Sequence, residues 1–244
     1  MIPAWLQEEI DPNNFKEILL ALEKSESKHL MEQADLLAIP LGVPNTDDCK
    51  HPAHLTEGKT SSQQGESKLV VEFGSLWASP LCGDLLRRSG CRVIKIESLS
   101  RPDGARRGPT GFFDLLNGGK ESLALDFSDD KSLELLKKIV KEADVIVEGS
   151  RPRALRQLGI DAEKEVEAGK VWISITGYGR TGPRSKGVAF GDDAAVSGGL
   201  FLKDPLSFIA DAVADPSAGL LAATLALSAL KSGKGWLIDI PLSA

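Results

Sequence analysis

Histidine and cysteine, the residues that most often hold metals or drive nucleophilic catalysis, are scarce in this sequence. The 244 residues contain three of each, and Cys49, Cys82 and Cys91 lie far apart without a C-x-x-C pair. Such a set makes a poor metal site and no disulfide framework, so we expect no bound metal and a reducing compartment, the cytoplasm. No histidine occurs between residues 68 and 244. Covalent chemistry in that region would therefore depend on a carboxylate, a cysteine or a lysine.

Long apolar runs and an excess of positive charge are also absent. The longest apolar run, residues 220–230, is interrupted by two hydroxyl side chains and is too short to cross a bilayer. The first residues, MIPAWLQEEIDP, carry acids where a signal peptide needs bases. The net charge of -6 argues against nucleic acid or an anionic membrane as a partner. We therefore expect a cytoplasmic protein that binds neither.

The pattern of the chain changes near residue 67. Residues 1–44 predict a helical segment, with one helix starting at Asn13 or Asn14 and a second over KHLMEQADLLA. Residues 45–67 are polar and rich in turn formers, which is typical of a linker. Residues 68–244 are expected to form the main domain.

Short runs rich in valine and isoleucine alternate with helical segments in residues 68–244. Each long helical segment ends before the next apolar run, and Asp129 or Asp130 is expected to cap the one that precedes residue 144. This alternation predicts an α/β fold with a Rossmann-like, doubly wound parallel sheet and helices on both faces. The expected extended segments are residues 69–74, 92–97, 122–127, 144–149, 170–179, 207–213 and 235–242.

The segment GYGRTG, residues 177–182, is a literal G-x-G-x-x-G directly after an expected strand. A dinucleotide site needs the third glycine to open a helix whose amides meet the pyrophosphate. Here Pro183 follows, and the segment GSLWASPLCG after the first strand lacks the glycine spacing. The pattern therefore favours a turn at a strand end. A nucleotide-dependent oxidoreductase is accordingly only a weak alternative for the function.

Arginines gather just after two of the expected strands, at the ends where doubly wound sheets bind ligands. Guanidinium groups match phosphate geometry, so the clusters indicate either a phosphate-bearing ligand or a solvated charged loop. The residues are Arg101, Arg106 and Arg107 after the second strand, and Arg151, Arg153 and Arg156 after residues 144–149.

The segment ADPSAG places Asp215 directly before an apolar helix that extends to Gly233. Asp is a preferred N-cap residue and Pro216 suits the first helical position, so the local pattern favours a helix cap over a nucleophile. The N-terminus of a helix also stabilises an ionised carboxylate by about 0.3–1 kcal/mol. Asp215 is therefore expected to be charged at pH 7.

Five segments, in order and in register, resemble the N-terminal half of the class III CoA-transferases, a family that includes formyl-CoA transferase, carnitine CoA-transferase and the α-methylacyl-CoA racemases. The resemblance covers about residues 69–242 and implies a Rossmann-like large domain in an interlocked dimer. Residues 15–44 resemble the end of the small domain of that family. The five segments are VVEFGSLWASPLCGDLLRRSGCRVIKIES, FFDLLNGGKESLALDFS, ADVIVEGSRPRALRQLGI, VWISITGYGRTGP and VADPSAGLLAATLALSAL.

The resemblance implies an enzyme that moves CoA between an acyl-CoA and a carboxylic acid. Asp215 would become acylated, then carry CoA as an aspartyl thioester until the acceptor carboxylate takes the CoA. CoA is then a substrate, and no permanently bound cofactor is expected. The implied CoA contacts are Ser75, Leu76, Trp77, Ala78, Leu125, Gly149 and Ser150, with Arg151, Arg153 and Arg156 as candidates for binding the phosphates.

The sequence departs from that family in two ways. The racemases have a histidine in the segment corresponding to VAFGDDAAVSGG, and its absence here disfavours α-proton exchange. Family members also continue beyond the position of DIPLSA into a small domain and a glycine-rich loop over the site. We therefore expect that the 244 residues do not alone complete the site, and that a second copy or a complementary half contributes to it. A CoA-binding or pseudoenzyme subunit of a tandem or split transferase, without turnover, is the alternative.

Overall fold

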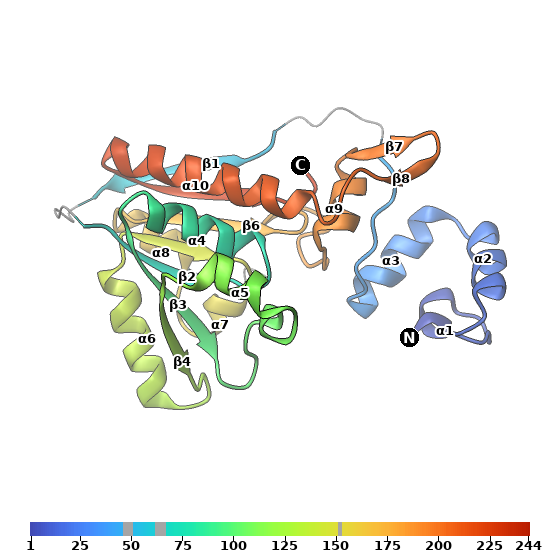
Figure 1. Cartoon of the computed structure of the whole chain (residues 1–244), viewed down its shortest axis with the longest axis horizontal. Coiled ribbons are helices and arrows are strands. Elements are labelled where there is room, and N and C mark those ends of the chain that lie inside the picture. Colours follow the sequence, from blue (N-terminus) through green and yellow to red (C-terminus); the bar gives the residue numbers. More distant parts are fainter. Residues whose placement is uncertain (46–50, 62–66, 151–152) are drawn as a thin grey trace.

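The computed structural model describes residues 1–45, 51–61, 67–150 and 153–244. They form an α/β body and, beside it, a group of three short helices from the start of the chain (Figure 1). Among the described residues, no helix is both long enough and apolar enough to span a membrane.

A seven-stranded sheet forms the centre of the α/β body (Figure 1). Its order is β1-β9-β6-β5-β2-β3-β4, and neighbouring strands are parallel except for the antiparallel pair of β1 and β9. Without β1, the strands follow the order 3-2-1-4-5-6 along the chain, which confirms the predicted doubly wound sheet. The strands are β1 (His54–Thr60), β2 (Leu69–Phe73), β3 (Arg92–Ser98), β4 (Glu121–Leu125), β5 (Val145–Glu148), β6 (Val171–Thr176) and β9 (Lys234–Pro241).

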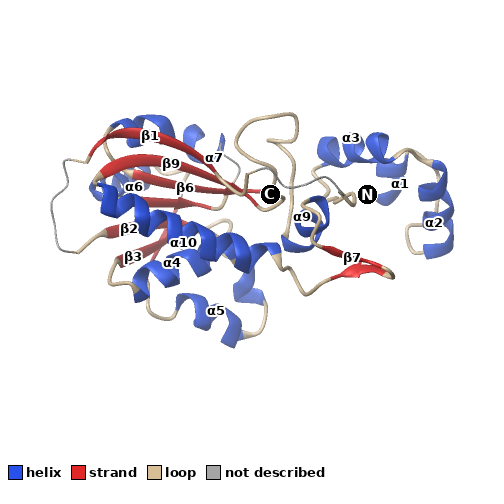
Figure 2. Ribbon diagram, turned by 90° about the horizontal axis from the view of Figure 1, so that it is seen from above, coloured by secondary structure: helices blue, strands red, loops and turns tan. Residues whose placement is uncertain are grey.

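The central strands are apolar along most of their length because helices cover both faces of the sheet (Figure 2). Helices α4 and α10 pack side by side on one face, where Leu86 and Ala222 are fully buried. Helices α6 and α8 cover the other face with Leu136 and Val166. The helices of the body are α4 (Ala78–Arg88), η1 (Gly104–Arg107), α5 (Thr110–Asn117), α6 (Asp130–Glu142), α7 (Arg153–Gln157), α8 (Ala162–Glu167) and α10 (Ala214–Ser232).

The first helices, α1 (Ile2–Leu6), α2 (Phe15–Lys24) and α3 (Ser27–Leu37), pack around a small core of their own that contains Leu6, Ala21 and Leu30. The expected helix starts are confirmed at Asn14, which accepts a hydrogen bond from Glu17 N, and at Asp129, which accepts one from Ser132 N. Local side-chain oxygens at these positions satisfy N–H groups that the helix itself leaves open.

Polar contacts of Arg184 and Tyr178 join the N-terminal segment to the α/β body. Arg184 pairs with Asp35 of α3 at 3.0 Å, and the Tyr178 hydroxyl donates to the Leu41 carbonyl oxygen at 3.0 Å. Helix α9 (Gly191–Ser197) and the hairpin of β7 (Phe201–Lys203) and β8 (Leu206–Phe208) lie between the two parts (Figure 2).

Two segments differ from the prediction. Residues 54–60 lie in the predicted linker but form the edge strand β1, and nearly every residue of β1 is exposed. A strand with no buried face needs no apolar alternation, so composition could not reveal it. Residues 207–213 were expected to be one strand, but residues 206–208 form β8, which pairs with β7, and the chain then turns into α10. Residues 206–208 pair with β7 because a tight turn places the two segments side by side.

Candidate active site

The sheet has its topological switch point between β2 and β5. These strands are parallel neighbours, but the helix after β2 packs on one face of the sheet and the helix after β5 on the other. In doubly wound sheets, the crevice beyond the strand ends at this point binds ligands. Gly74 and Ser75 follow β2, and Gly149 and Ser150 follow β5, so all four residues lie at the crevice.

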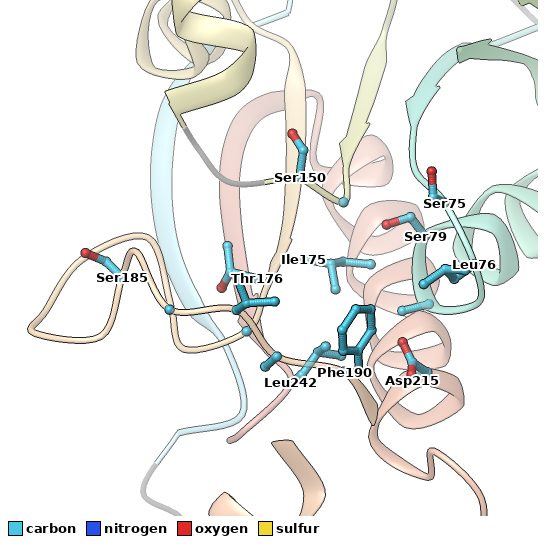
Figure 3. A pocket seen from close by; sticks show the side chains of 16 residues that line it. Ser75, Leu76, Ser79, Ser150, Ile175, Thr176, Ser185, Phe190, Asp215 and Leu242 are labelled. Atoms are coloured by element: carbon cyan, nitrogen blue, oxygen red, sulfur yellow. The ribbon is translucent and has the colours of Figure 1, made fainter. Parts of the chain in front are cut away.

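Two cavities meet at this crevice and share Ser75, Leu76, Gly149 and Ser150 as lining residues. The first has a volume of about 240 Å³ and extends to Asp215 on α10. Figure 3 shows Asp215 and Phe190 together at one end of it and Ser150 toward the other. The second has a volume of about 810 Å³ and extends over the loop that follows β3. The shared wall makes the pair suitable for one elongated ligand with chemically different ends.

Asp215 lies inside the first turn of its helix, so its predicted role as the N-cap is wrong. Helix α10 begins at Ala214, and Val213 takes the N-cap position. The turn before the helix is held instead by Asp192, whose carboxylate accepts a hydrogen bond from Ala212 N at 2.7 Å. Because another residue holds the turn, the Asp215 carboxylate is free to contact other segments.

Two backbone N–H groups from distant segments lie near the Asp215 carboxylate and lower its pKa. One belongs to Ala78 at the start of α4, and the other to Gly191 at the start of α9. Glycine is required at 191, because a Cβ there would collide with Asp215 Oδ2 and with the Ala212 carbonyl oxygen. The carboxylate thus lies against the main chain in the wall of the first cavity.

Burial raises the pKa of Asp215 to about 6. The hydrogen bonds from Ala78 and Gly191 lower the pKa, while the nearby carboxylates of Asp192 and Asp193 raise it further. Desolvation is the largest of these effects, so the net shift is opposite to the one expected from the helix terminus alone. At pH 7 the group is still mostly ionised, in agreement with the expected charge state.

We expect the Asp215 carboxyl group to ionise with a midpoint near pH 6, because burial raises its pKa to about 6. The ionised fraction of such a group is roughly one tenth at pH 5 and nine tenths at pH 7. Carbon-detected NMR of the carboxyl groups during a pH titration checks this. A midpoint of about 4 would show that Asp215 has an ordinary carboxyl pKa.

Some of the arginines predicted to bind phosphates line a cavity, and others are held in ion pairs. Arg101 and Arg153 line the second cavity. Arg156 instead pairs with Glu163 at 2.9 Å, and Arg106 pairs with Glu97 while its guanidinium lies over the Phe113 ring. Arg107 is exposed, and Arg151 lies outside the described residues.

Most of the other predicted CoA contacts line the first cavity, but Trp77 and Leu125 do not. Ser75, Leu76, Ala78, Gly149 and Ser150 line the first cavity. Trp77 packs edge-to-face on the Phe112 ring, with 5.3 Å between the ring centroids, and Leu125 is buried in the core at the end of β4.

Ser79 and Phe190 are among the cavity residues that were not predicted. Ser79 is buried in the first turn of α4 beside Gly149, and Phe190 precedes α9 with about half of its surface exposed. The position of Ser79 six residues after the last residue of β2 was the only local signal for it. Among the described residues, no group of three or more His, Cys, Asp or Glu side chains is arranged to hold a metal ion.

The GYGRTG segment forms a turn that is anchored by buried side chains. Arg180 lies 3.1 Å from Glu148 Oε2, and its backbone N–H donates to Asp239 at 2.8 Å. Gly179 N donates to the Thr176 hydroxyl, and Gly179 has a positive φ of 91°. The segment thus positions the loop of residues 185–190, several of which line the first cavity, and the structural interpretation of the glycines is confirmed.

Comparisons with known proteins agree with this arrangement. Succinyl-CoA–D-citramalate CoA-transferase of Chloroflexus aurantiacus is 31% identical over 189 residues, which cover 70% of this chain and 47% of that protein. The beta subunit of succinyl-CoA–L-malate CoA-transferase of the same organism is 28% identical over 205 residues, covering 76% and 51%. A CAIB/BAIF family protein from Brucella suis has a similar structure, with a TM-score of 0.66 at 30% identity over 76% of this chain and 54% of that one.

The chain spans about half the length of the curated relatives it matches. The family model of CoA-transferase family III matches residues 66–244, which include the whole parallel sheet, both cavities and Asp215. The chain therefore belongs to CoA-transferase family III.

Proposed function

We propose that this protein moves CoA between an acyl-CoA and a carboxylic acid, with Asp215 as the nucleophile. One observation carries the proposal. The Asp215 carboxylate lies in the wall of a cavity at the switch point of the sheet, against the main chain of Ala78 and Gly191, whose N–H groups lower its pKa. A carboxylate that is oriented, desolvated and still mostly ionised at pH 7 is suited to nucleophilic attack.

In the proposed first stage, Asp215 exchanges its oxygen for the sulfur of CoA. A carboxylate oxygen attacks the thioester carbonyl, the C–S bond breaks, and the CoA thiolate departs. Asp215 then carries the acyl group as a mixed anhydride. The thiolate then attacks the aspartyl carbonyl carbon of that anhydride and expels the donor as a free carboxylate. An aspartyl–CoA thioester remains, and neither oxidant nor metal is consumed.

In the second stage, the acceptor reverses these steps. Its carboxylate attacks the aspartyl thioester carbonyl and releases the CoA thiolate, which leaves a new mixed anhydride. The thiolate then attacks the acceptor carbonyl, so the new acyl-CoA departs and the Asp215 carboxylate is regenerated. A partly desolvated Asp215 supports both stages, because its ionised form is the attacking group and also the final leaving group.

We place the nucleotide end of CoA in the second cavity. Arg101 and Arg153 line it, and guanidinium groups bind phosphate oxygens through paired hydrogen bonds. The shared wall of Ser75, Leu76, Gly149 and Ser150 would then carry the pantetheine portion toward Asp215. Racemase chemistry is not favoured, since residues 68–244 contain no histidine to act as the base.

We further propose that a second copy or a complementary chain covers the first cavity. Leu76 and Phe190 line that cavity and are 39% and 48% exposed, so part of its apolar wall faces solvent in this chain. Exclusion of water strengthens the electrostatic control of a thioester reaction. One relative is itself named as a beta subunit, which is in keeping with a site shared between chains.

Covalent trapping tests the proposal. The protein is incubated with succinyl-CoA and then treated with hydroxylamine, which converts an aspartyl anhydride or thioester to a hydroxamate that mass spectrometry can locate. We expect the hydroxamate at Asp215, and none in an Asp211→Asn/Asp215→Asn double variant, while Asp211→Asn alone retains it. Isothermal titration with CoA gives the second readout. CoA binding without any adduct would favour a binding subunit without turnover, and the absence of both would contradict the proposal.

A further inference from the structure

Four charged side chains form a buried network beneath the loop that joins β2 to α4. Lys95 lies 3.1 Å from Glu72 Oε1 and 2.9 Å from Asp103 Oδ2, and Lys120 lies 2.6 Å from Glu72 Oε2. Their side chains are at most 1% exposed. The two positive and two negative charges balance, so the network is electrically neutral as a whole.

Such a network is costly to bury, and a well-packed apolar cluster would stabilise the fold as well or better. The main chain has nevertheless been shaped to hold it. A Cβ at Gly83 of α4 would collide with Glu72 Oε2, so only glycine leaves room for the carboxylate at that turn of the helix. This points to a role for the network besides stability.

The network binds the main chain at three successive points, from the β2–α4 loop into the first turn of α4. Lys95 donates to the Gly74 carbonyl oxygen at 2.6 Å, and Lys120 donates to the Pro80 carbonyl oxygen at 2.8 Å. Between them, Asp103 Oδ1 accepts a hydrogen bond from Leu76 N at 2.9 Å. Leu76 has a φ of +68°, a conformation that is unfavourable for a side chain of this kind and that needs such an anchor.

The held segment contains Ala78, which lines the first cavity together with Asp215 and whose backbone N–H lowers the pKa of that carboxylate. Ala78 lies two residues after the anchored Leu76 and two before the anchored Pro80. Any movement of the loop between these anchors would move that N–H group relative to the carboxylate. The same loop supplies Ser75 and Leu76 to the wall between the two cavities.

We propose that Asp103, with Lys95 and Lys120, is a positioning residue of the active site, which fixes the β2–α4 loop so that Ala78 N–H points at Asp215. The inference rests on the proposed function for its catalytic consequence. The geometric part, a link between Asp103 and the Asp215 carboxylate through the loop, stands without any turnover.

Two substitutions separate the contributions of Asp103. Asp103→Ala removes both the hydrogen bond to Leu76 N and the ion pair with Lys95. Asp103→Asn keeps a carbonyl oxygen for Leu76 N and loses only the charge. The matched control is Asp84→Asn, because Asp84 is also buried but pairs with Arg87 and Arg88 on its own helix.

The first readout is the pKa of Asp215, followed by carbon-detected NMR of the carboxyl groups during a pH titration. Loss of the Ala78 hydrogen bond should raise this pKa by about half a unit to one unit in Asp103→Ala and by less in Asp103→Asn. The second readout is the rate of the trapped Asp215 adduct, which should fall about tenfold or more in Asp103→Ala, in line with a displaced catalytic group. Asp84→Asn should leave both unchanged.

An unchanged Asp215 pKa and adduct rate in a folded Asp103→Ala would overturn the proposal. If Asp103→Ala does not fold, the test uses Asp103→Asn. An Asp215 pKa and an adduct rate equal to those of the unaltered protein would then overturn the proposal. Failure of the proposed function looks different, because then even the unaltered protein forms no adduct. The NMR titration still tests the link between Asp103 and Asp215 in that case.

Discussion

Asp215→Asn is expected to reduce CoA transfer by at least about a thousandfold, while the Kd for CoA changes by no more than about threefold. The amide has nearly the same shape as the carboxylate and can still accept a hydrogen bond from Ala78 or Gly191 through its oxygen. It has no ionised oxygen with which to attack a thioester. The chemical step is therefore lost, whereas the nucleotide contacts proposed for Arg101 and Arg153 are distant and unaffected.

Steady-state kinetics with succinyl-CoA and a carboxylate acceptor, together with calorimetry of CoA binding, measure the two quantities. Asp211→Asn is the matched control, since Asp211 is an exposed acid four residues earlier and should retain full activity. A transfer rate within tenfold of the unaltered protein in Asp215→Asn would show that another group attacks the thioester. A parallel loss of CoA affinity would instead place Asp215 among the binding groups.

Arg180→Leu is expected to lower the free energy of unfolding by about 3–5 kcal/mol at pH 7. Arg180 and Glu148 are 8% and 1% exposed at the side chain and lie 3.1 Å apart. The substitution leaves the Glu148 carboxylate buried with neutral donors, Trp172 and Ser174 at 3.1 Å and 3.3 Å from Oε2 and Ser150 at 3.5 Å from Oε1. An unpaired buried charge carries most of the cost.

The stability deficit of Arg180→Leu should depend on pH in one particular direction. Burial already raises the pKa of Glu148 above its usual value, although Arg180 counteracts that effect. Without Arg180 the pKa rises further, so the folded variant binds a proton more readily than the unfolded chain does. Its stability therefore increases as the pH falls from 7 toward the usual carboxyl range, and the deficit relative to the unaltered protein becomes smaller.

Urea denaturation at pH 7 and pH 5 measures the deficit. The double variant Arg180→Leu/Glu148→Gln serves as the control, because it removes the unpaired charge and should recover part of the loss. A deficit that is the same at both pH values, or a double variant no more stable than the single one, would show that lost packing rather than the Glu148 charge determines the effect.

The doubly wound parallel sheet could be predicted because each central strand carries its own evidence. The segments LVVEF, VIVE and VWISIT are buried on both faces, and such strands are apolar along most of their length. The exposed strand β1 has no such requirement, so its sequence HLTEGKT looked like a linker. Pairing with β9, far along the chain, makes it a strand. The division of the chain into domains stays a prediction.

The site could be predicted in part for the same reason. Residues that directly follow buried strands, such as Ser75 and Ser150, can be placed at the switch point once the strands are known. Arg153 and Arg156 follow the same strand and were predicted alike, but Arg153 lines the second cavity, whereas Arg156 pairs with Glu163 and Asp161. Ion pairs between segments cannot be read from local spacing.

The sequence by itself determined the doubly wound sheet, the position of its crevice and the candidacy of Asp215, because these depend on hydrophobic pattern, strand ends and a resemblance in register. Only the tertiary structure decided the helix position, the neighbours and the pKa of Asp215. It shows that Val213 caps the helix, that the N–H groups of Ala78 and Gly191 lie near the carboxylate, and that burial raises its pKa to about 6. Each of these depends on contacts between segments distant in sequence, which form only when α4, α9 and α10 pack together at the carboxyl end of the sheet.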